Sequence, residues 1–334
     1  MKYGYFDDKR MEYVIRNPKT PLPWINYLGT EDFFSLKSNT CGGYSFYRDA
    51  KLLRLTRYRY NNIPPDNNGC YFYIKDEDVV WNPGWQPVKT DLDEYICRFG
   101  LGYGTFNGTK NKVNAKVLSF VPLGDNCEVN RLSIRNDSGV VKELKVFSYV
   151  EFCLWNADDD MKNFQRNLST GEVEVEDSVI YHKTEYRERR NHYAFFSVNT
   201  PMTAFDTSRD AFLGPYNGPD RPDAVFGNGC TNSKASGWSP IGAHQVDVRL
   251  LPDESIDLIY VLGYCENPEE NKWEAPGVIN KRGARNLVSK YSTDGQVDVA
   301  FNDLRRYWEE LLERYSVDCR DENVSSMVNI WNQY

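Results

Sequence analysis

The chain of 334 residues lacks the features that define several large classes of protein. No stretch approaches the ~20 apolar residues that span a bilayer, and residues 1–25 carry charge throughout, without the apolar core of a secretory signal. Basic residues are outnumbered, with 40 Lys and Arg against 48 Asp and Glu, for a net charge of −8. A phosphate backbone is bound through concentrated Lys and Arg. The sequence therefore predicts a soluble, cytoplasmic protein that binds neither a membrane nor nucleic acid.

Residues that typically hold metals or act as nucleophiles are also sparse. The three histidines, at positions 182, 192 and 244, share no metal-ligand spacing, and no Gly-x-Ser-x-Gly motif occurs. The eight cysteines contain no C-x-x-C pair, which favours reduced, buried thiols over a zinc site or a disulfide framework. Gly100–Gly104 is glycine-rich but lacks the Lys-Ser/Thr of a phosphate-binding P-loop, so a turn is favoured. We expect no metal and no cofactor.

Aromatic residues are abundant, at 14% of the chain, with 23 Tyr and 8 Trp. Tyr and Trp combine an apolar ring with a polar tip, which suits sugar binding but is also common in all-β proteins. Both interpretations stay open. The segment Trp81–Pro87 places two Trp around a Pro-Gly turn, and it either fills an interface or lines a sugar site.

Short alternating apolar and polar segments, separated by Asn-Gly and similar turns, continue from Met1 to about Leu262. The alternation predicts strands, and Asn107-Gly108 and Asn136–Gly139 are typical of hairpin turns. So many strands without intervening helices predict a mainly β protein, built as a large antiparallel β-sandwich. The predicted strands lie in residues 71–74, 113–121, 131–134, 144–152, 173–181 and 193–198.

The pattern changes to helical near Pro276-Gly277, with helices predicted over 280–291 and 298–315 and a new amphipathic helix from about Glu322. This predicts an N-terminal β-sandwich domain over residues 1–275, a helical linker over 276–318 and the start of a further helical unit over 319–334. The last helix stops without a cap, so we expect the chain to be a fragment of a longer protein.

The most informative segment is Glu151–Asn167, where an apolar run ending at Trp155 meets a loop rich in amides and acids. Amides and a fixed cation bind neutral polyols and small anions, and Trp155 and Phe164 could stack on sugars. Binding groups tend to sit on loops held by rigid sheets. The three acids Asp158–Asp160 favour a solvated loop or a helix N-cap over a cation site. The segment suggests a carbohydrate, and a phosphate, as partners.

The chain resembles the N-terminal part of the inverting glycoside phosphorylases, most closely the cellobiose phosphorylases, over essentially its whole length. The motifs that carry the resemblance are Met1–Phe6, Pro23–Gly29, Gly42–Asp49, Arg57–Tyr60, Trp81–Pro87, Glu151–Asn167 and Asn329–Tyr334.

The resemblance implies a galactose-mutarotase-like sandwich, a helical linker and an (α/α)6 barrel that carries the catalytic acid. Only the first barrel helix falls within this chain, so no catalytic residue is expected here. The implied reaction is cellobiose plus inorganic phosphate giving α-D-glucose 1-phosphate and D-glucose, with inversion. One acid protonates the glycosidic oxygen, and phosphate, already an anion, attacks without the second carboxylate of an inverting hydrolase.

The resemblance also implies that a sandwich loop completes the active site, across a homodimer. Here that loop is best matched by residues 156–166, and we expect four side chains to contact sugar hydroxyls: Asn156, Asn163, Gln165 and Arg166. Alternatively, the loop only braces an interface.

Two other functions stay open. The chain could be a freestanding, non-catalytic carbohydrate-binding or scaffold sandwich, although its helical end argues against this. It could also belong to a phosphorylase for another β-linked sugar, such as chitobiose, laminaribiose or a cellodextrin.

Overall fold

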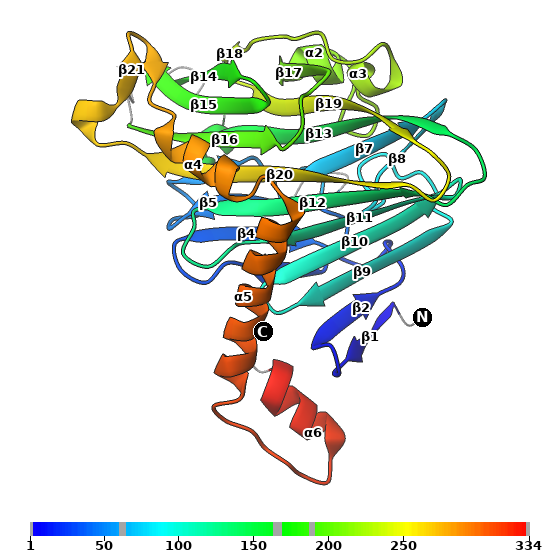
Figure 1. Ribbon diagram of the computed structural model, residues 1–334. Helices are drawn as coiled ribbons and strands as arrows, with labels where there is room; N and C mark the ends of the chain where they lie inside the picture. Colours follow the sequence, from blue (N-terminus) through cyan, green and yellow to red (C-terminus); the bar gives the residue numbers. More distant parts are fainter. Residues whose placement is uncertain (1–2, 60–64, 163–168, 187–190, 332–334) are drawn as a thin grey trace.

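The computed structural model describes residues 3–59, 65–162, 169–186 and 191–331. Within these residues two large sheets face each other, and all their strand pairs are antiparallel (Figure 1). The predicted mainly β sandwich is therefore confirmed.

The larger sheet contains eleven strands among the described residues. In spatial order they are β1 (Gly4–Asp7), β2 (Glu12–Ile15), β9 (Glu94–Gly100), β10 (Tyr103–Lys110), β11 (Val113–Phe120), β12 (Cys127–Asn136), β20 (Ser255–Glu266), β16 (His192–Val198), β15 (Val179–Tyr186), β14 (Ser169–Glu176) and β18 (Ser236–Gly237).

The second sheet contains nine strands in the same described ranges. Seven follow one another as β17 (Ala204–Ser208), β19 (Pro240–Leu250), β13 (Lys142–Trp155), β6 (Arg54–Thr56), β5 (Gly43–Tyr47), β4 (Phe33–Ser38) and β3 (Ile25–Leu28), while β7 (Tyr71–Asp76) pairs with β13 and with β8 (Val79–Trp81). The 14-residue β13 is central, because it pairs with β19 along most of its length, with β7 over Leu144–Tyr149 and with β6 near its end.

Side chains of the larger sheet are buried on both faces. Along β20, Leu258, Tyr260 and Leu262 belong to the core between the sheets, whereas Ile259 and Val261 belong to a second apolar cluster on the outer face. This period of two follows from the pleat of a strand. Because apolar side chains also point to the outer face, that face must be shielded from water by other elements.

Two helices supply that cover: α4 (Arg282–Lys290) and α5 (Asp294–Leu312) cross the outer face of the larger sheet (Figure 1). Both helices were predicted, with ends shifted by a few residues. A capping box between Thr293 and Gln296 begins α5, and its Val297 and Leu304 are fully buried. The predicted domain boundaries at residues 275 and 318 stay predictions.

The remaining elements are short. They are α1 (Ala157–Met161), α2 (Arg209–Leu213), α3 (Asp223–Phe226), a 3-10 turn (Glu269–Asn271), the hairpin β21 (Trp273–Ala275) and β22 (Val278–Ile279), α6 (Glu322–Ser326) and a π-helical turn (Met327–Trp331). No helix of the described residues has both the length and the apolar character to cross a membrane.

One turn prediction and one strand prediction were wrong. Asn107-Gly108 lies inside β10, where a Cβ on Gly108 would come within 2.9 Å of the Pro83 carbonyl oxygen, so the glycine permits close backbone approach. The predicted strand 173–181 is instead a hairpin that turns at Asp177, which has a φ of 51°. The turn predicted at Gly100–Gly104 is confirmed by Gly102, with a φ of 73° between β9 and β10.

Candidate functional site

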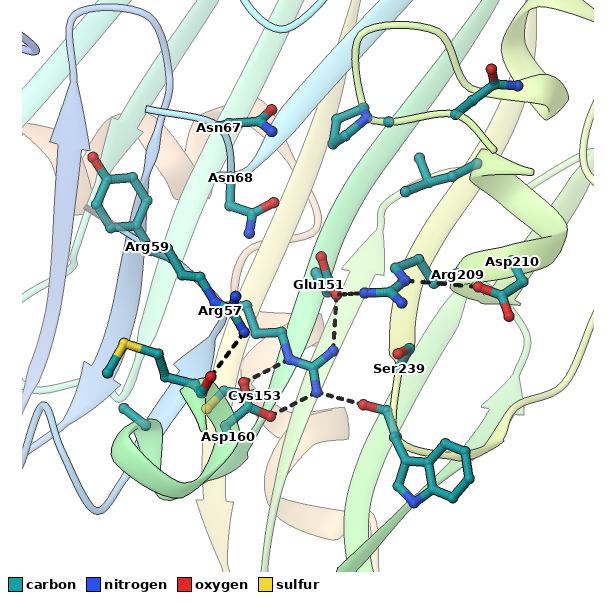
Figure 2. A pocket seen from close by; sticks show the side chains of 18 of the residues that line it. Arg57, Arg59, Asn67, Asn68, Glu151, Cys153, Asp160, Arg209, Asp210 and Ser239 are labelled. Carbon is teal, nitrogen blue, oxygen red and sulfur yellow. Dashed lines mark hydrogen bonds and ion pairs between the residues drawn. The ribbon is translucent and has the colours of Figure 1, made fainter. Parts of the chain in front are cut away.

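A polar pocket of about 490 Å³ opens where β6 and β13 end, beside α1, α2 and the loops at 214–219 and 238–239 (Figure 2). Four arginines line it, together with the amides of Asn67, Asn68 and Asn217. Guanidinium and amide groups donate hydrogen bonds to hydroxyl and anionic oxygens. The pocket can therefore bind polyols or small anions. The four arginines are Arg54, Arg57, Arg59 and Arg209.

Arg57 connects the parts of the pocket wall. Its Nε and Nη2 donate to Oδ2 and Oδ1 of Asp160 at 2.7 and 2.6 Å, and its Nη1 donates to Oε1 of Glu151 at 2.9 Å. Nη2 also donates to the main-chain oxygen of Trp238 (Figure 2). A bidentate pair of this kind fixes orientation as well as charge. Arg57 thus joins β13, α1 and the 238–239 loop.

Arg209, at the start of α2, shares the same carboxylate. Its Nη1 donates to Oε1 of Glu151 at 3.1 Å, and its side chain is 40% exposed. The Glu151 side chain is only 7% exposed. Burial raises the pKa of Glu151, but the two guanidinium groups outweigh it, so the pKa lies below its ordinary value. Glu151 is therefore a carboxylate at neutral pH and a poor proton donor.

The charge of Arg57 agrees with this. Burial lowers the pKa of Arg57, but the carboxylates of Glu151 and Asp160 outweigh the burial and raise the pKa overall. The cluster is an alternation of two cations and two anions, so most of its charge is compensated internally. Arg54, Arg59 and the amides that line the pocket are outside this cluster.

Of the four predicted sugar-contacting residues, Asn156 lies in the described part of the chain. Its Oδ1 caps α1 by accepting from the backbone N–H groups of Asp158 and Asp159, each at 3.1 Å. It stands next to Ala157, which lines the pocket. Asn163, Gln165 and Arg166 lie outside the described residues, as does Phe164. The acidic segment Asp158–Asp160, predicted as a solvated loop or a helix N-cap, instead forms the first turn of α1, and the cap is Asn156.

Trp155 does not offer a face to a sugar. Its side chain is fully buried, and its ring lies 4.3 Å from that of His192 and 5.9 Å from that of His182. Trp81 is fully buried as well, whereas Trp85 is partly buried against the core. The 81–87 segment thus packs into the sandwich core, which is neither of its two interpretations, an interface or a sugar site. The three histidines are buried, and no cluster of metal-ligating side chains occurs in the part of the chain that the structure describes.

The sequence patterns missed the residues that build the pocket. Arg57 stood only in a family motif, Glu151 only as the first residue of the segment Glu151–Asn167, and Asp160 only as the last of the three acids assigned to a solvated loop or a helix N-cap. No sequence pattern indicated Arg209 as a pocket residue, because it is 58 residues from Glu151 in the sequence and contacts it only in the folded protein.

Residues 11–294 match the family described as glycosyl hydrolase 94, supersandwich domain. The chain therefore belongs to the glycosyl hydrolase 94 family.

Curated relatives match along the whole chain. An N,N′-diacetylchitobiose phosphorylase of Vibrio furnissii is 33% identical over 100% of this chain and 40% of its own length. A solabiose phosphorylase of Paenibacillus borealis is 27% identical over 98% of this chain and 42% of its own length. The chain thus spans about 40% of the length of these relatives.

A bacterial glucoamylase solved with acarbose superposes with a TM-score of 0.53 at 10% identity, over 90% of this chain and 41% of that one. At this identity the match shows a shared fold.

Proposed function

We propose that the chain is the N-terminal part of an inverting glycoside phosphorylase that cleaves a β-linked disaccharide with inorganic phosphate. The observation that carries the proposal is the match of the whole chain to two enzymes named as disaccharide phosphorylases. In such a reaction the glycosidic C1–O bond breaks, the leaving oxygen takes a proton from an acid, and a phosphate oxygen bonds to C1.

The sandwich contributes binding groups in this proposal, and the acid lies elsewhere in the longer protein. Glu151 and Asp160 are the carboxylates at the centre of the pocket, and both are paired with Arg57. A general acid must hold a proton near neutral pH, whereas Arg57 and Arg209 keep the pKa of Glu151 below its ordinary value. Both carboxylate oxygens of Asp160 accept hydrogen bonds from Arg57. The pocket amides and the Arg209 guanidinium suit sugar hydroxyls. We further propose that the intact protein is a cytoplasmic homodimer.

Cellobiose is the substrate predicted from the sequence, and N,N′-diacetylchitobiose is the alternative that the 33% identical relative favours. We would incubate the full-length gene product with phosphate and each of cellobiose, laminaribiose and N,N′-diacetylchitobiose, and measure the sugar 1-phosphate formed. We expect phosphate-dependent cleavage of one of them, and none by residues 1–334 alone. Absence of sugar phosphate with all three sugars would reject the proposal for these substrates.

The role of Asn156 can be separated from its capping role. Asn156→Asp retains the oxygen that caps α1 but removes the Nδ2 donor, whereas Asn156→Ala removes both. If Nδ2 contacts a sugar hydroxyl, Asn156→Asp raises the KM for the disaccharide without lowering thermal stability. Gln165→Ala and Arg166→Ala are expected to raise the same KM. Kinetics unchanged in all four variants at subsaturating disaccharide would remove these residues from the site.

A further inference from the structure

Helix α1 forms one wall of the pocket through Ala157, Asp160 and Met161. It has five residues, whereas isolated helices shorter than about 12 residues are marginal in water. Its position must therefore come from contacts with the sandwich.

Three contacts made by the described residues attach α1. The backbone N–H of Ala157 donates to the Lys51 carbonyl oxygen at 2.7 Å, and the Met161 carbonyl oxygen accepts from Nη2 of Arg59 at 3.2 Å. Both use main-chain atoms of α1, which any residue would provide. The third is the bidentate pair between Asp160 and Arg57, at 2.7 and 2.6 Å. It depends on the side chain of Asp160.

Arg57 is a rigid anchor for this contact. Its own backbone N–H donates to the Glu151 carbonyl oxygen at 2.8 Å, which ties it to β13. Its guanidinium is held from two further sides, by the Glu151 carboxylate at 2.9 Å and by the Trp238 carbonyl oxygen. The orientation of Asp160 is therefore set by the sheet (Figure 2).

The same helix offers a matched comparison. Asp158 pairs with Lys162 at 2.8 Å, one helical turn away, and the two side chains are 36% and 62% exposed. Exposed pairs of this kind contribute little. The Asp160 side chain is 8% exposed and pairs across 103 residues of sequence. The two aspartates differ in burial and in what they connect.

We propose that Asp160 is a positioning residue, which fixes α1, and with it one wall of the pocket, to the edge of the sandwich through its bidentate pair with Arg57. Its effect on sugar binding rests on the proposed function. Its effect on α1 does not.

The first test measures amide hydrogen exchange by mass spectrometry in the full-length protein, comparing Asp160→Asn with Asp158→Asn. Asp160→Asn is expected to speed exchange in peptides covering 157–162 about tenfold or more, because opening α1 no longer breaks the pair. Peptides from β11 should change less than about twofold, and Asp158→Asn should leave both regions close to wild type. Equal exchange in the two variants, or an equal rise in α1 and β11, would overturn the proposal.

A second variant covers the case in which Asp160→Asn does not fold. Arg57→Lys keeps the positive charge but loses the guanidinium fork, and it is expected to speed exchange in the same peptides. Unchanged exchange at α1 in Arg57→Lys would overturn the proposal as well.

The kinetic test separates this inference from the proposed function. In an active wild-type enzyme, Asp160→Asn is expected to raise the KM for the disaccharide about tenfold, more than it lowers kcat, whereas Asp158→Asn changes neither. An unchanged KM with faster exchange at α1 would overturn the positioning role. A wild-type protein with no phosphorolysis would reject the proposed function, while the exchange result would still decide how α1 is held.

Discussion

At the scale of single residues, Glu151 is a buried carboxylate between two guanidinium groups. Arg57 and Arg209 hold the pKa of Glu151 below its ordinary 4.5, against the effect of burial. A carboxylate with a lowered pKa in the folded protein stabilises the fold above its unfolded pKa. This stabilisation is lost as the pH falls through the folded pKa.

Glu151→Gln is therefore expected to lower the free energy of unfolding by about 3 kcal/mol at pH 7, because it leaves Arg57 partly uncompensated. The difference between variant and wild type should stay constant from pH 7 to about 5 and shrink below about pH 4.5. Denaturant titrations at pH 7, 5 and 3.5 measure it. Glu143→Gln, at an exposed position on the same strand, is the control. A difference that does not change with pH would contradict this account.

A second buried pair lies between the sheets, where Nζ of Lys37 and Oε1 of Glu128 are 2.6 Å apart and both side chains are nearly inaccessible. Lys37→Met leaves Glu128 buried without its cation. The expected loss is about 3–5 kcal/mol of unfolding free energy.

The double variant Lys37→Met/Glu128→Leu removes both charges and is expected to recover most of that loss. Denaturant unfolding of wild type, the two single variants and the double variant gives the coupling energy directly. A double variant less stable than Lys37→Met alone would show that the Lys37 charge is not what offsets the burial of Glu128.

At the scale of elements, the end of β13 decides how the pocket is built. Trp155 has a φ of 67° and a fully buried ring, so the strand ends inside the core while the chain turns out into α1. Trp155→Ala is expected to lower the free energy of unfolding by about 3–5 kcal/mol, as large-to-small core changes do. Thermal or denaturant unfolding checks this. A variant of wild-type stability that binds disaccharide more weakly would instead support stacking on a sugar.

Many of the strands and helices could be predicted from the sequence. Alternation predicted β7, β11, β12, β13 and β16, and helical spacing predicted α4 and α5, because these segments bury one face or two in a regular period. Asn107-Gly108 was misread because the same dipeptide serves a hairpin turn and a close backbone approach, and only the neighbouring loop at Pro83 distinguishes them.

The residues that form the pocket were harder to predict from the sequence than the fold was. Its chemistry depends on Arg57, Glu151 and Arg209, which meet only after β6, β13 and α2 are placed beside one another. Such pairings between distant residues cannot be predicted from composition or from residue spacing. The acidic cluster shows the same limit: its three aspartates look alike in the sequence, yet only Asp160 is buried.

At the scale of the whole molecule, the sandwich holds the pocket residues in place, and the proposed proton transfer to the glycosidic oxygen takes place outside the sandwich. The chain spans about 40% of the length of its phosphorylase relatives. Glu151 and Asp160 are both paired with Arg57; in the proposed function the pocket binds the sugar and the proton comes from outside the pocket.

Phosphate dependence is the most direct test of this account. The full-length protein is mixed with a β-linked disaccharide, with and without inorganic phosphate, and the products are followed by ³¹P and ¹H NMR. We predict an α-configured sugar 1-phosphate and one free sugar, formed only when phosphate is present. Cleavage to two free sugars at a rate independent of phosphate, or a β-configured sugar phosphate, would contradict the account.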